Sequence, residues 1–203
     1  MTQSGRCDVN GNQDLSAKDL GNSRILNLLL KPAGLIMGSK LRRKIFDPVK
    51  TLQGAGIRSG QTVLEVGCGT GFFTIPAAQL IGDQGSLLAT DVMVGYLEQV
   101  SEKVRKEGLT NVQILNRDGL KTGLDSDSID VVLLFGVVPY PSLPLNRLLP
   151  EMHRVLKLDG RLAVWLFPTS GWVPKSIVRS GLFIFIDKRN GVYNYRQSNQ
   201  ISP

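Results

Sequence analysis

The sequence predicts one α/β domain built on a mostly parallel, doubly wound β-sheet. Five apolar runs of strand length alternate with segments of helical periodicity between residues 60 and 167, and a glycine-rich turn follows the first run. Strands that alternate with helices form parallel sheets with helices on both faces. A chain of 203 residues is long enough for one well-packed domain and short for two.

The elements follow in a regular order. The expected strands are residues 62–66, 86–91, 112–118, 129–138 and 161–167, and the expected helices are 72–81, about 93–107 and about 144–157. Gly160 follows the third expected helix and has the position of its C-terminal cap. Residues 182–186 and 192–195 flank an Asn-Gly turn, which predicts a C-terminal antiparallel hairpin and brings the sheet to seven strands.

The N-terminal region differs in composition from this domain, for which we expect residues 60–203. Residues 1–22 are rich in Ser, Asn, Gly, Gln and Asp and are predicted to be disordered. Residues 23–59 are predicted to form a helical cap, because residues 24–46 contain apolar clusters that end in a basic group. Such a segment suits a membrane surface, and it equally suits a helix that packs on the sheet.

Overall composition excludes several classes of protein. The net charge of +7 leaves open a nucleic acid, a membrane, an acidic substrate or simply a solvated face. Two cysteines and one histidine, without ligand spacing, argue against a metal site and a disulfide framework. No apolar run approaches the roughly 20 residues of a membrane-spanning helix, and the N-terminus lacks a signal-peptide pattern. We therefore expect a soluble, cytoplasmic protein without a metal.

The most informative segment is TVLEVGCGTGFF, residues 62–73, in which Glu65 precedes glycines at three alternate positions. A dinucleotide loop requires a third glycine where Phe72 or Thr74 stands, and a phosphate-binding loop requires a Gly-Lys-Ser/Thr ending that is also missing. Neither of these nucleotide sites is therefore predicted.

The remaining pattern, E-x-G-x-G-x-G, resembles the first motif of the class I S-adenosylmethionine-dependent methyltransferases, which have a Rossmann-like fold. The resemblance extends over residues 46–167, with Asp91 and Asp118 at the next two expected strand ends and Asp130 at the start of the fourth strand. The motif spacing and the FDP sequence at residues 46–48 are similar to the type 11 branch, which includes ubiquinone and menaquinone C-methyltransferases.

The resemblance implies that S-adenosylmethionine is the cofactor. An acid at Asp91 accepts hydrogen bonds from ribose hydroxyls, and an acid at Asp118 contacts the adenine amino group in the family, although Asp118 also fits a plain turn. Glu65 either contacts the ligand or orders the loop through backbone N–H groups, and Met93 packs either on adenine or in the core. The predicted cofactor-binding residues are Glu65, Gly67, Cys68, Gly69, Gly71, Asp91, Val92, Met93, Asp118, Gly119 and Phe135.

The implied reaction is in-line methyl transfer to a small-molecule or lipophilic acceptor, and the sequence assigns no catalytic residue. Cys68 is interpreted as a small packed residue, and His153 lies on a helix away from the expected ligand edge. Tyr140 is a further candidate for the acceptor pocket. The turn after the fourth strand lacks the Asn-Pro-Pro-Tyr motif, which argues against a nucleic-acid acceptor. A non-catalytic cofactor-binding subunit and a nucleic-acid-associated methyltransferase remain the alternatives.

Overall fold

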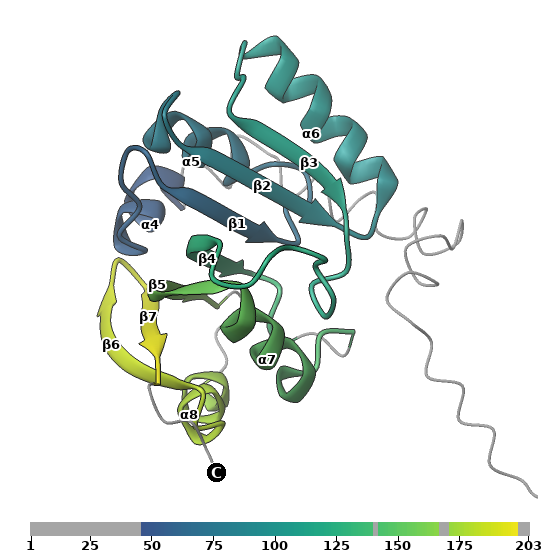
Figure 1. Cartoon of the computed structure of the whole chain (residues 1–203). Coiled ribbons are helices and arrows are strands. Elements are labelled where there is room, and N and C mark those ends of the chain that lie inside the picture. Colours follow the sequence, from purple (N-terminus) through teal and green to yellow (C-terminus); the bar gives the residue numbers. More distant parts are fainter. Residues whose placement is uncertain (1–45, 140–141, 167–170, 199–203) are drawn as a thin grey trace, which may run out of the picture.

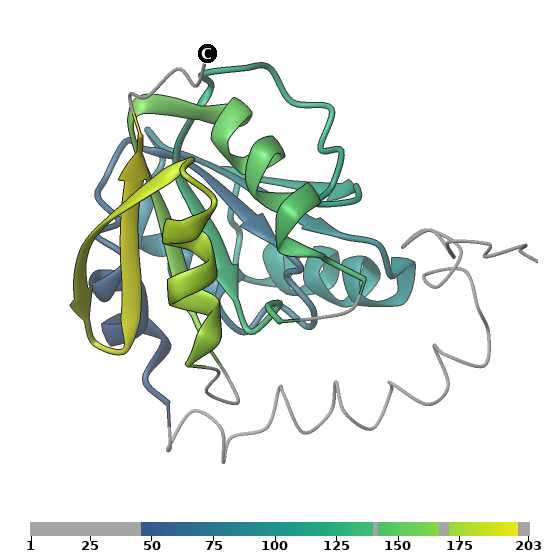
Figure 2. The ribbon, with the colours of Figure 1, turned by 90° about the horizontal axis from the view of Figure 1, so that it is seen from below.

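A computed structural model describes residues 46–139, 142–166 and 171–198, and the predicted fold class is confirmed in them. Seven strands form one sheet in the order β3-β2-β1-β4-β5-β7-β6, with helices on both faces (Figures 1 and 2). The strands β1 to β5 are parallel, and β7 is antiparallel to both of its neighbours. The strands are β1 (Thr62–Val66), β2 (Ser86–Asp91), β3 (Val112–Asn116), β4 (Ile129–Phe135), β5 (Leu156–Trp165), β6 (Phe183–Arg189) and β7 (Val192–Gln197).

Five helices of the described residues cover the sheet: α4 (Pro48–Gly54), α5 (Thr74–Ile81), α6 (Val94–Lys106), α7 (Leu145–Val155) and α8 (Trp172–Arg179). The helices α5 and α6 lie on one face and α7 and α8 on the other (Figures 1 and 2). Each face has its own buried core, because alternate side chains of the central strands point to opposite faces. None of the described helices is long and apolar enough to cross a bilayer.

The boundary between α7 and β5 differs from the prediction. The helix ends at Val155, because Leu156 has an extended backbone and pairs with Ile129 of β4. Gly160 is therefore a residue of β5, and its predicted role as a helix cap is wrong. A Cβ atom at Gly160 would lie 2.7 Å from the Lys157 carbonyl oxygen, so this position needs glycine for a close approach within the strand.

The third strand is shorter than predicted and ends at Asn116. The Asn116 side-chain amide donates to the carbonyl oxygens of Asp91 and Val92, at 3.1 and 3.2 Å, which joins the ends of β2 and β3. The chain then turns, because the Asp118 carboxylate accepts a hydrogen bond from the Leu120 N–H at 2.9 Å. Asp118 consequently lies in a turn two residues beyond the strand.

The short helix α4 is fixed to the C-terminal hairpin. Asp47 caps its N-terminus by accepting from the N–H groups of residues 49 and 50. At the other end, the buried Asn194 side chain donates to the Gly54 carbonyl oxygen at 2.9 Å, and Asn190 donates to the Lys50 carbonyl at 2.8 Å. Residues 1–45, which include the segment 1–22 predicted to be disordered and the predicted cap up to residue 45, lie outside the described residues, as does Tyr140.

At the end of the sheet opposite the glycine loop, Asp130 joins three strands. One carboxylate oxygen accepts from the Thr62 N–H at 2.7 Å, and the other pairs with the Lys157 ammonium at 2.7 Å. These contacts join the first residues of β1, β4 and β5. Asp130 thus stabilises the sheet at the end away from the expected ligand.

Candidate functional site

The glycine loop connects β1 to α5 at the carboxyl end of the strands. Gly67, Gly69 and Gly71 have φ values of +71°, +52° and +80°, in the left-handed region that side chains disfavour. The N–H groups of Gly67 and Cys68 donate to the Thr90 carbonyl oxygen at 2.8 and 2.9 Å. The backbone of the loop is therefore held against the end of β2.

The three glycines differ in what surrounds them. A Cβ atom at Gly67 would lie 2.4 Å from the Val137 side chain, and one at Gly71 would lie 3.1 Å from Val100. At Gly69, no atom of the described chain lies within 4 Å of that position. Packing within the protein accounts for the first and third glycines, whereas Gly69 leaves open space in which a ligand can approach the backbone.

Asp91 ends β2 directly beside this opening and is 9% exposed. One carboxylate oxygen accepts from the Gly69 N–H and the other from the Met93 N–H, both at 2.9 Å. Burial raises the pKa of Asp91, although these backbone hydrogen bonds oppose the shift. An ionised carboxylate has about four acceptor positions, so Asp91 can still accept hydrogen bonds from a ligand.

Glu65 is buried below the loop at 2% exposure. Its carboxylate accepts a hydrogen bond from the Thr74 hydroxyl at 2.7 Å, which connects β1 to the start of α5. Burial and the negative charge of Asp91 raise the pKa of Glu65 to about 8, against the opposing effect of the Thr74 hydrogen bond. The hypothesis that Glu65 orders the loop through backbone N–H groups is wrong, because Thr90 and Asp91 accept from those groups instead.

The other predicted contacts near the loop are also buried. Cys68 is 5% exposed and belongs to a cluster with Leu97 and Val100 of α6. Burial and the charge of Glu65 raise the pKa of the Cys68 thiol, which keeps it protonated and supports its interpretation as a packed residue. Met93, which is 8% exposed, immediately precedes α6. Val92, between Asp91 and Met93, is half-buried.

The turn after β3 lies beside the end of β1. A Cβ atom at Gly119 would be 2.7 Å from the Val66 side chain, so glycine permits this close approach. The structure thereby brings Asp118 and Gly119 to the same edge as the glycine loop. Asp118 lies in a turn, as one of its two interpretations predicted, and its contact with adenine stays a prediction.

Phe135, the last residue of β4, lies within an aromatic cluster. Its ring centroid is 4.9 Å from that of Phe73, in an edge-to-face arrangement, and 6.5 Å from that of Trp165. Phe46 contacts Trp165 from the other side, at 5.4 Å. This cluster was not predicted, since an aromatic pair after a glycine loop indicates burial but does not identify the residues against which it packs. The cluster supports the loop from below.

A mostly apolar groove of about 700 Å³ lies between α7 and α8 and was not predicted from the sequence. It begins at Pro139 in the connection after β4, on the same edge of the sheet as the glycine loop. Its other lining residues are Pro144, Leu145, Asn146, Leu149, Trp172, Ser176, Arg179 and Ser180. Trp172 is 54% exposed, which is unusual for so large an apolar side chain. No local pattern of the sequence indicates this exposure.

The fold and the loop together define a class of protein. Residues 63–160 match a family model described as a methyltransferase domain, and this range contains the glycine loop, Asp91 and Asp118. The match confirms the predicted resemblance to the class I S-adenosylmethionine-dependent methyltransferases. The match supports S-adenosylmethionine as the cofactor.

The similar curated proteins are named demethylmenaquinone methyltransferases. The protein from Lactobacillus johnsonii is 29% identical over 61% of this chain and 48% of its own length. The one from Listeria welshimeri is 32% identical over 56% of this chain and 48% of its own length, and the one from Shouchella clausii is 29% identical over 68% and 57%. The chain thus spans about half the length of the curated relatives it matches.

Solved structures share the fold at lower identity. An S-adenosylmethionine-dependent methyltransferase from Aquifex aeolicus has a TM-score of 0.66 and 24% identity, covering 82% of this chain and 96% of that one. The (4+2)-cyclase SpnF has a TM-score of 0.68 and 17% identity, covering 85% of this chain and 74% of that one. One architecture therefore accompanies different reactions, and the reaction has to be argued from the site.

Proposed function

We propose that this chain transfers a methyl group from S-adenosylmethionine to a lipophilic acceptor of the quinone-precursor type. One observation carries the proposal: Gly69 faces open space, and its N–H is held by the Asp91 carboxylate at the same point. A backbone without a side chain, next to a buried carboxylate with spare acceptor positions, suits a nucleoside with ribose hydroxyls.

Individual residues have distinct roles in this proposal. Asp91 accepts from the ribose hydroxyls, Met93 packs against the adenine ring, and Asp118 accepts from the adenine amino group. Glu65 places a second acidic side chain beneath the loop, toward the cationic amino-acid tail. The remaining predicted contacts, Gly67, Cys68, Gly71, Val92, Gly119 and Phe135, shape and support the loop.

The chemistry requires alignment more than a reactive side chain. S-adenosylmethionine supplies a methyl carbon that its sulfonium already activates. Holding donor and acceptor in line contributes up to about 7–11 kcal/mol in favourable cases, and the protein supplies this through the rigid loop and sheet edge. His153 packs edge-to-face on Phe183, with ring centroids 5.7 Å apart, near the end of α7. We assign it no role as a base.

The apolar groove between α7 and α8 supports a lipophilic acceptor. Its volume of about 700 Å³ falls within the range of about 300–1,000 Å³ for small-molecule sites. It starts at the connection after β4, so an acceptor with its reactive ring at the sheet edge can place an apolar tail between the helices. The names of the curated relatives make a quinone precursor the first acceptor to test. A membrane contact through residues 24–46 and a cytoplasmic location stay predictions.

Calorimetric titration of S-adenosylmethionine into the full chain and into Gly69→Ala tests the cofactor site. The added methyl group meets no atom within 4 Å but enters the proposed ligand space, so we expect affinity to fall at least about tenfold. The positive φ of Gly69 makes alanine unfavourable there, so thermal stability should fall as well, and by about as much as in the control variant. Gly108→Ala is the matched control, because Gly108 also has a positive φ and open surroundings. Equal affinity in all three proteins would contradict the proposed site.

Transfer of a labelled methyl group to a demethylated, isoprenoid-bearing naphthoquinone then separates an enzyme from a binding subunit. Transfer supports the proposal, with the cofactor-only reaction as the blank. Saturable cofactor binding without transfer to this acceptor, to a shorter quinone or to nucleic acid would favour the non-catalytic alternative.

A further inference from the structure

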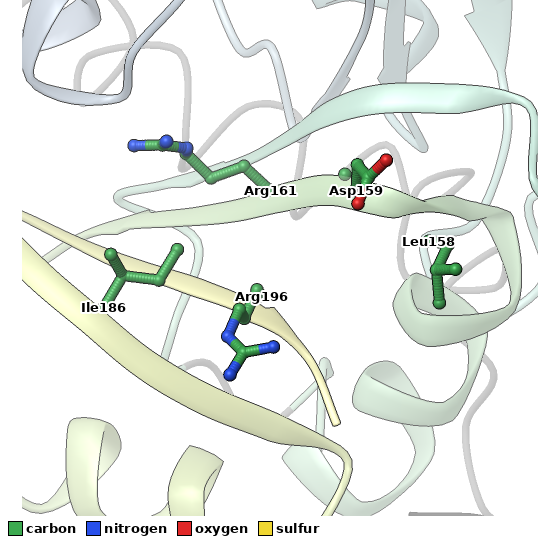
Figure 3. A pocket seen from close by; sticks show the side chains of 6 residues that line it. Leu158, Asp159, Arg161, Ile186 and Arg196 are labelled. Atoms are coloured by element: carbon green, nitrogen blue, oxygen red, sulfur yellow. The ribbon is translucent and has the colours of Figure 1, made fainter. Parts of the chain in front are cut away.

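We propose that a pocket at the end of the sheet opposite the glycine loop, where β5, β6 and β7 meet, is a binding site for a phosphate group. The pocket has a volume of about 210 Å³ and is lined by Leu158, Asp159, Gly160, Arg161, Ile186 and Arg196 (Figure 3). It lies at the start of β5 and the end of β7, whereas the glycine loop follows the carboxyl end of β1. The two sites are therefore separate.

Two arginines occupy directly opposed positions in this pocket. Arg161 of β5 and Arg196 of β7 are partners in the antiparallel ladder, and like charges in this arrangement destabilise a sheet. Among the described residues, neither guanidinium has an ion-pair partner within 4.0 Å. Their guanidinium groups diverge from adjacent strands (Figure 3), as expected of like charges. Arg196 is exposed, so its side chain can turn toward a phosphate group in the pocket, and this repulsion would then be replaced by attraction of both arginines to one anion.

Arg161 contributes a donor that the described protein does not satisfy. Its Nη1 atom is buried and has no hydrogen-bond partner among the described residues, and it lies close to Gly56, where a Cβ atom would be only 3.0 Å away. Burial and the charges of Arg189 and Arg58 lower the pKa of Arg161, although Asp187 opposes this effect. Gly56 does not line the pocket, so the buried Nη1 atom supplies positive charge there and no direct contact. The other guanidinium donors of Arg161 remain for a ligand, and such donors match phosphate oxygens in geometry.

The nearby acids do not neutralise this group of arginines. Asp187 is already occupied, because it accepts from the Asn194 side chain at 2.7 Å and pairs with Arg189 Nε at 3.2 Å. Asp159 lines the pocket but is exposed to solvent. Four arginines, at positions 58, 161, 189 and 196, face two aspartates, at 159 and 187, which leaves a formal excess of two positive charges. The local field favours an anion.

The rim of the pocket is apolar as well as basic. Leu158 is 64% exposed and Ile186 is 42% exposed, and the adjacent Ile184 and Phe185 are also exposed. The shared chemistry of the ligand is a phosphate group, which comes either from a free phosphorylated anion or from the head group of an anionic lipid. Exposed apolar side chains beside the arginines suit an amphiphilic carrier.

Thermal unfolding in inorganic phosphate and in chloride at equal ionic strength tests the site. Phosphate stabilises proteins in general by exclusion from their surface, so the informative quantity is the difference between variants. We expect phosphate to raise the Tm of the natural chain more than that of Arg161→Gln or Arg196→Gln. Arg105→Gln, an exposed arginine on α6, is the matched control and should respond like the natural chain. Equal shifts in all four proteins would overturn the proposal.

Direct titration with pyrophosphate and sedimentation with vesicles separate the sources of the phosphate. Loss of one charge-assisted hydrogen bond should weaken pyrophosphate binding by about tenfold or more in either variant. If phosphatidylglycerol vesicles retain the natural chain better than the double variant Arg161→Gln/Arg196→Gln, the phosphate belongs to a lipid head group. If the vesicles retain both proteins equally and the natural chain binds pyrophosphate, the ligand is a free anion. Phosphatidylcholine vesicles are the uncharged control. No arginine-dependent binding to either probe overturns the proposal. S-adenosylmethionine affinity should be unchanged in these variants, so the outcome is independent of the proposed cofactor site.

Discussion

At the residue scale, two acids beside the glycine loop have different environments and different partners. Asp91 accepts two backbone N–H groups at 2.9 Å and fixes the loop, whereas Glu65 accepts from one hydroxyl and lies fully within the core. The first arrangement favours a carboxylate and the second a neutral acid. The loop is thus flanked by one acid that holds its backbone, at the end of β2, and by a second acid that is buried beneath it, at the end of β1.

The raised pKa of Glu65 predicts a pH-dependent stability. The folded protein binds this proton up to a pH of about 8, while the unfolded chain releases it near 4.5. The stabilising contribution is fully present below about pH 4.5 and is lost as the pH rises to about 8, because the folded state then has to bury a charge. Urea unfolding of the natural chain should therefore show a free energy of unfolding that falls over this range relative to Glu65→Gln, by roughly 1.4 kcal/mol per pH unit at most.

The Glu65→Gln variant retains an oxygen that can accept from the Thr74 hydroxyl, so packing is preserved. Glu102→Gln, an exposed residue of α6, controls for the loss of one negative charge. A constant difference between the natural chain and Glu65→Gln from pH 5 to pH 8 would show that Glu65 is ionised throughout this range in the folded protein.

At the element scale, α7 fixes the turn that contains Asp118. The Glu151 carboxylate accepts from the Thr122 N–H and hydroxyl at 2.8 and 2.6 Å, and it pairs with Arg154 at 2.9 Å. These contacts, led by the Arg154 hydrogen bond, lower the pKa of Glu151 to about 2. The helix thus sets the position of a turn that the cofactor proposal requires.

Glu151→Gln should lower the free energy of unfolding by about 1–3 kcal/mol at pH 7, the usual range for hydrogen bonds to a charged group. Because the folded pKa is depressed, this contribution is present above about pH 4.5 and is lost as the pH falls toward about 2. Urea unfolding at pH 7, 5 and 3.5 measures the decrease. A difference that stays the same at pH 3.5 would exclude an ionic role for Glu151.

The groove between α7 and α8 yields a prediction about acceptor length. Trp172→Ala removes the largest exposed apolar side chain of the groove, so we expect the KM for a long-tailed acceptor to rise about tenfold, which corresponds to roughly 1.4 kcal/mol. Val178→Ala is the matched control, since Val178 is exposed on the same helix but does not line the groove. An equal rise for an acceptor without a tail would contradict this role for Trp172. S-adenosylmethionine affinity serves as the internal reference.

The boundaries of elements show what periodicity can and cannot predict. The strands β1 and β2 match their predicted ranges, because each is a short apolar run bounded by polar or glycine residues. The start of β5 was missed, since Leu156 fits the apolar stripe of α7 as well as a strand, and only its pairing with Ile129 decides between them. Similarly, Gly160 has the sequence position of a helix cap, but it lies within β5, where the Ile129 carbonyl oxygen of β4 would be 3.1 Å from a Cβ atom.

At the scale of the whole molecule, the glycine loop lies where the strand order reverses. The sheet runs from β1 toward β3 on one side and from β1 to β4 on the other, and ligands of doubly wound sheets bind at such a switch point. The sequence predicted the seven strands and placed Gly69 and Asp91 at strand ends. Their contact, the aromatic cluster around Phe135 and the α7–α8 groove depend on side chains far apart in the sequence, which local patterns do not specify.

The contact between Asn194 and Gly54 joins residues 140 positions apart, and it has a consequence for synthesis on the ribosome. The helix α4 is made before all of the described strands, but its partner in the hairpin lies in β7, which is the last of the described strands to be made. A short helix is marginal without tertiary contacts, so α4 cannot be held in place by the hairpin until β7 has formed. Translation that stalls before β7 should therefore leave β5 with an open edge, a surface on which nascent chains associate with chaperones or with each other.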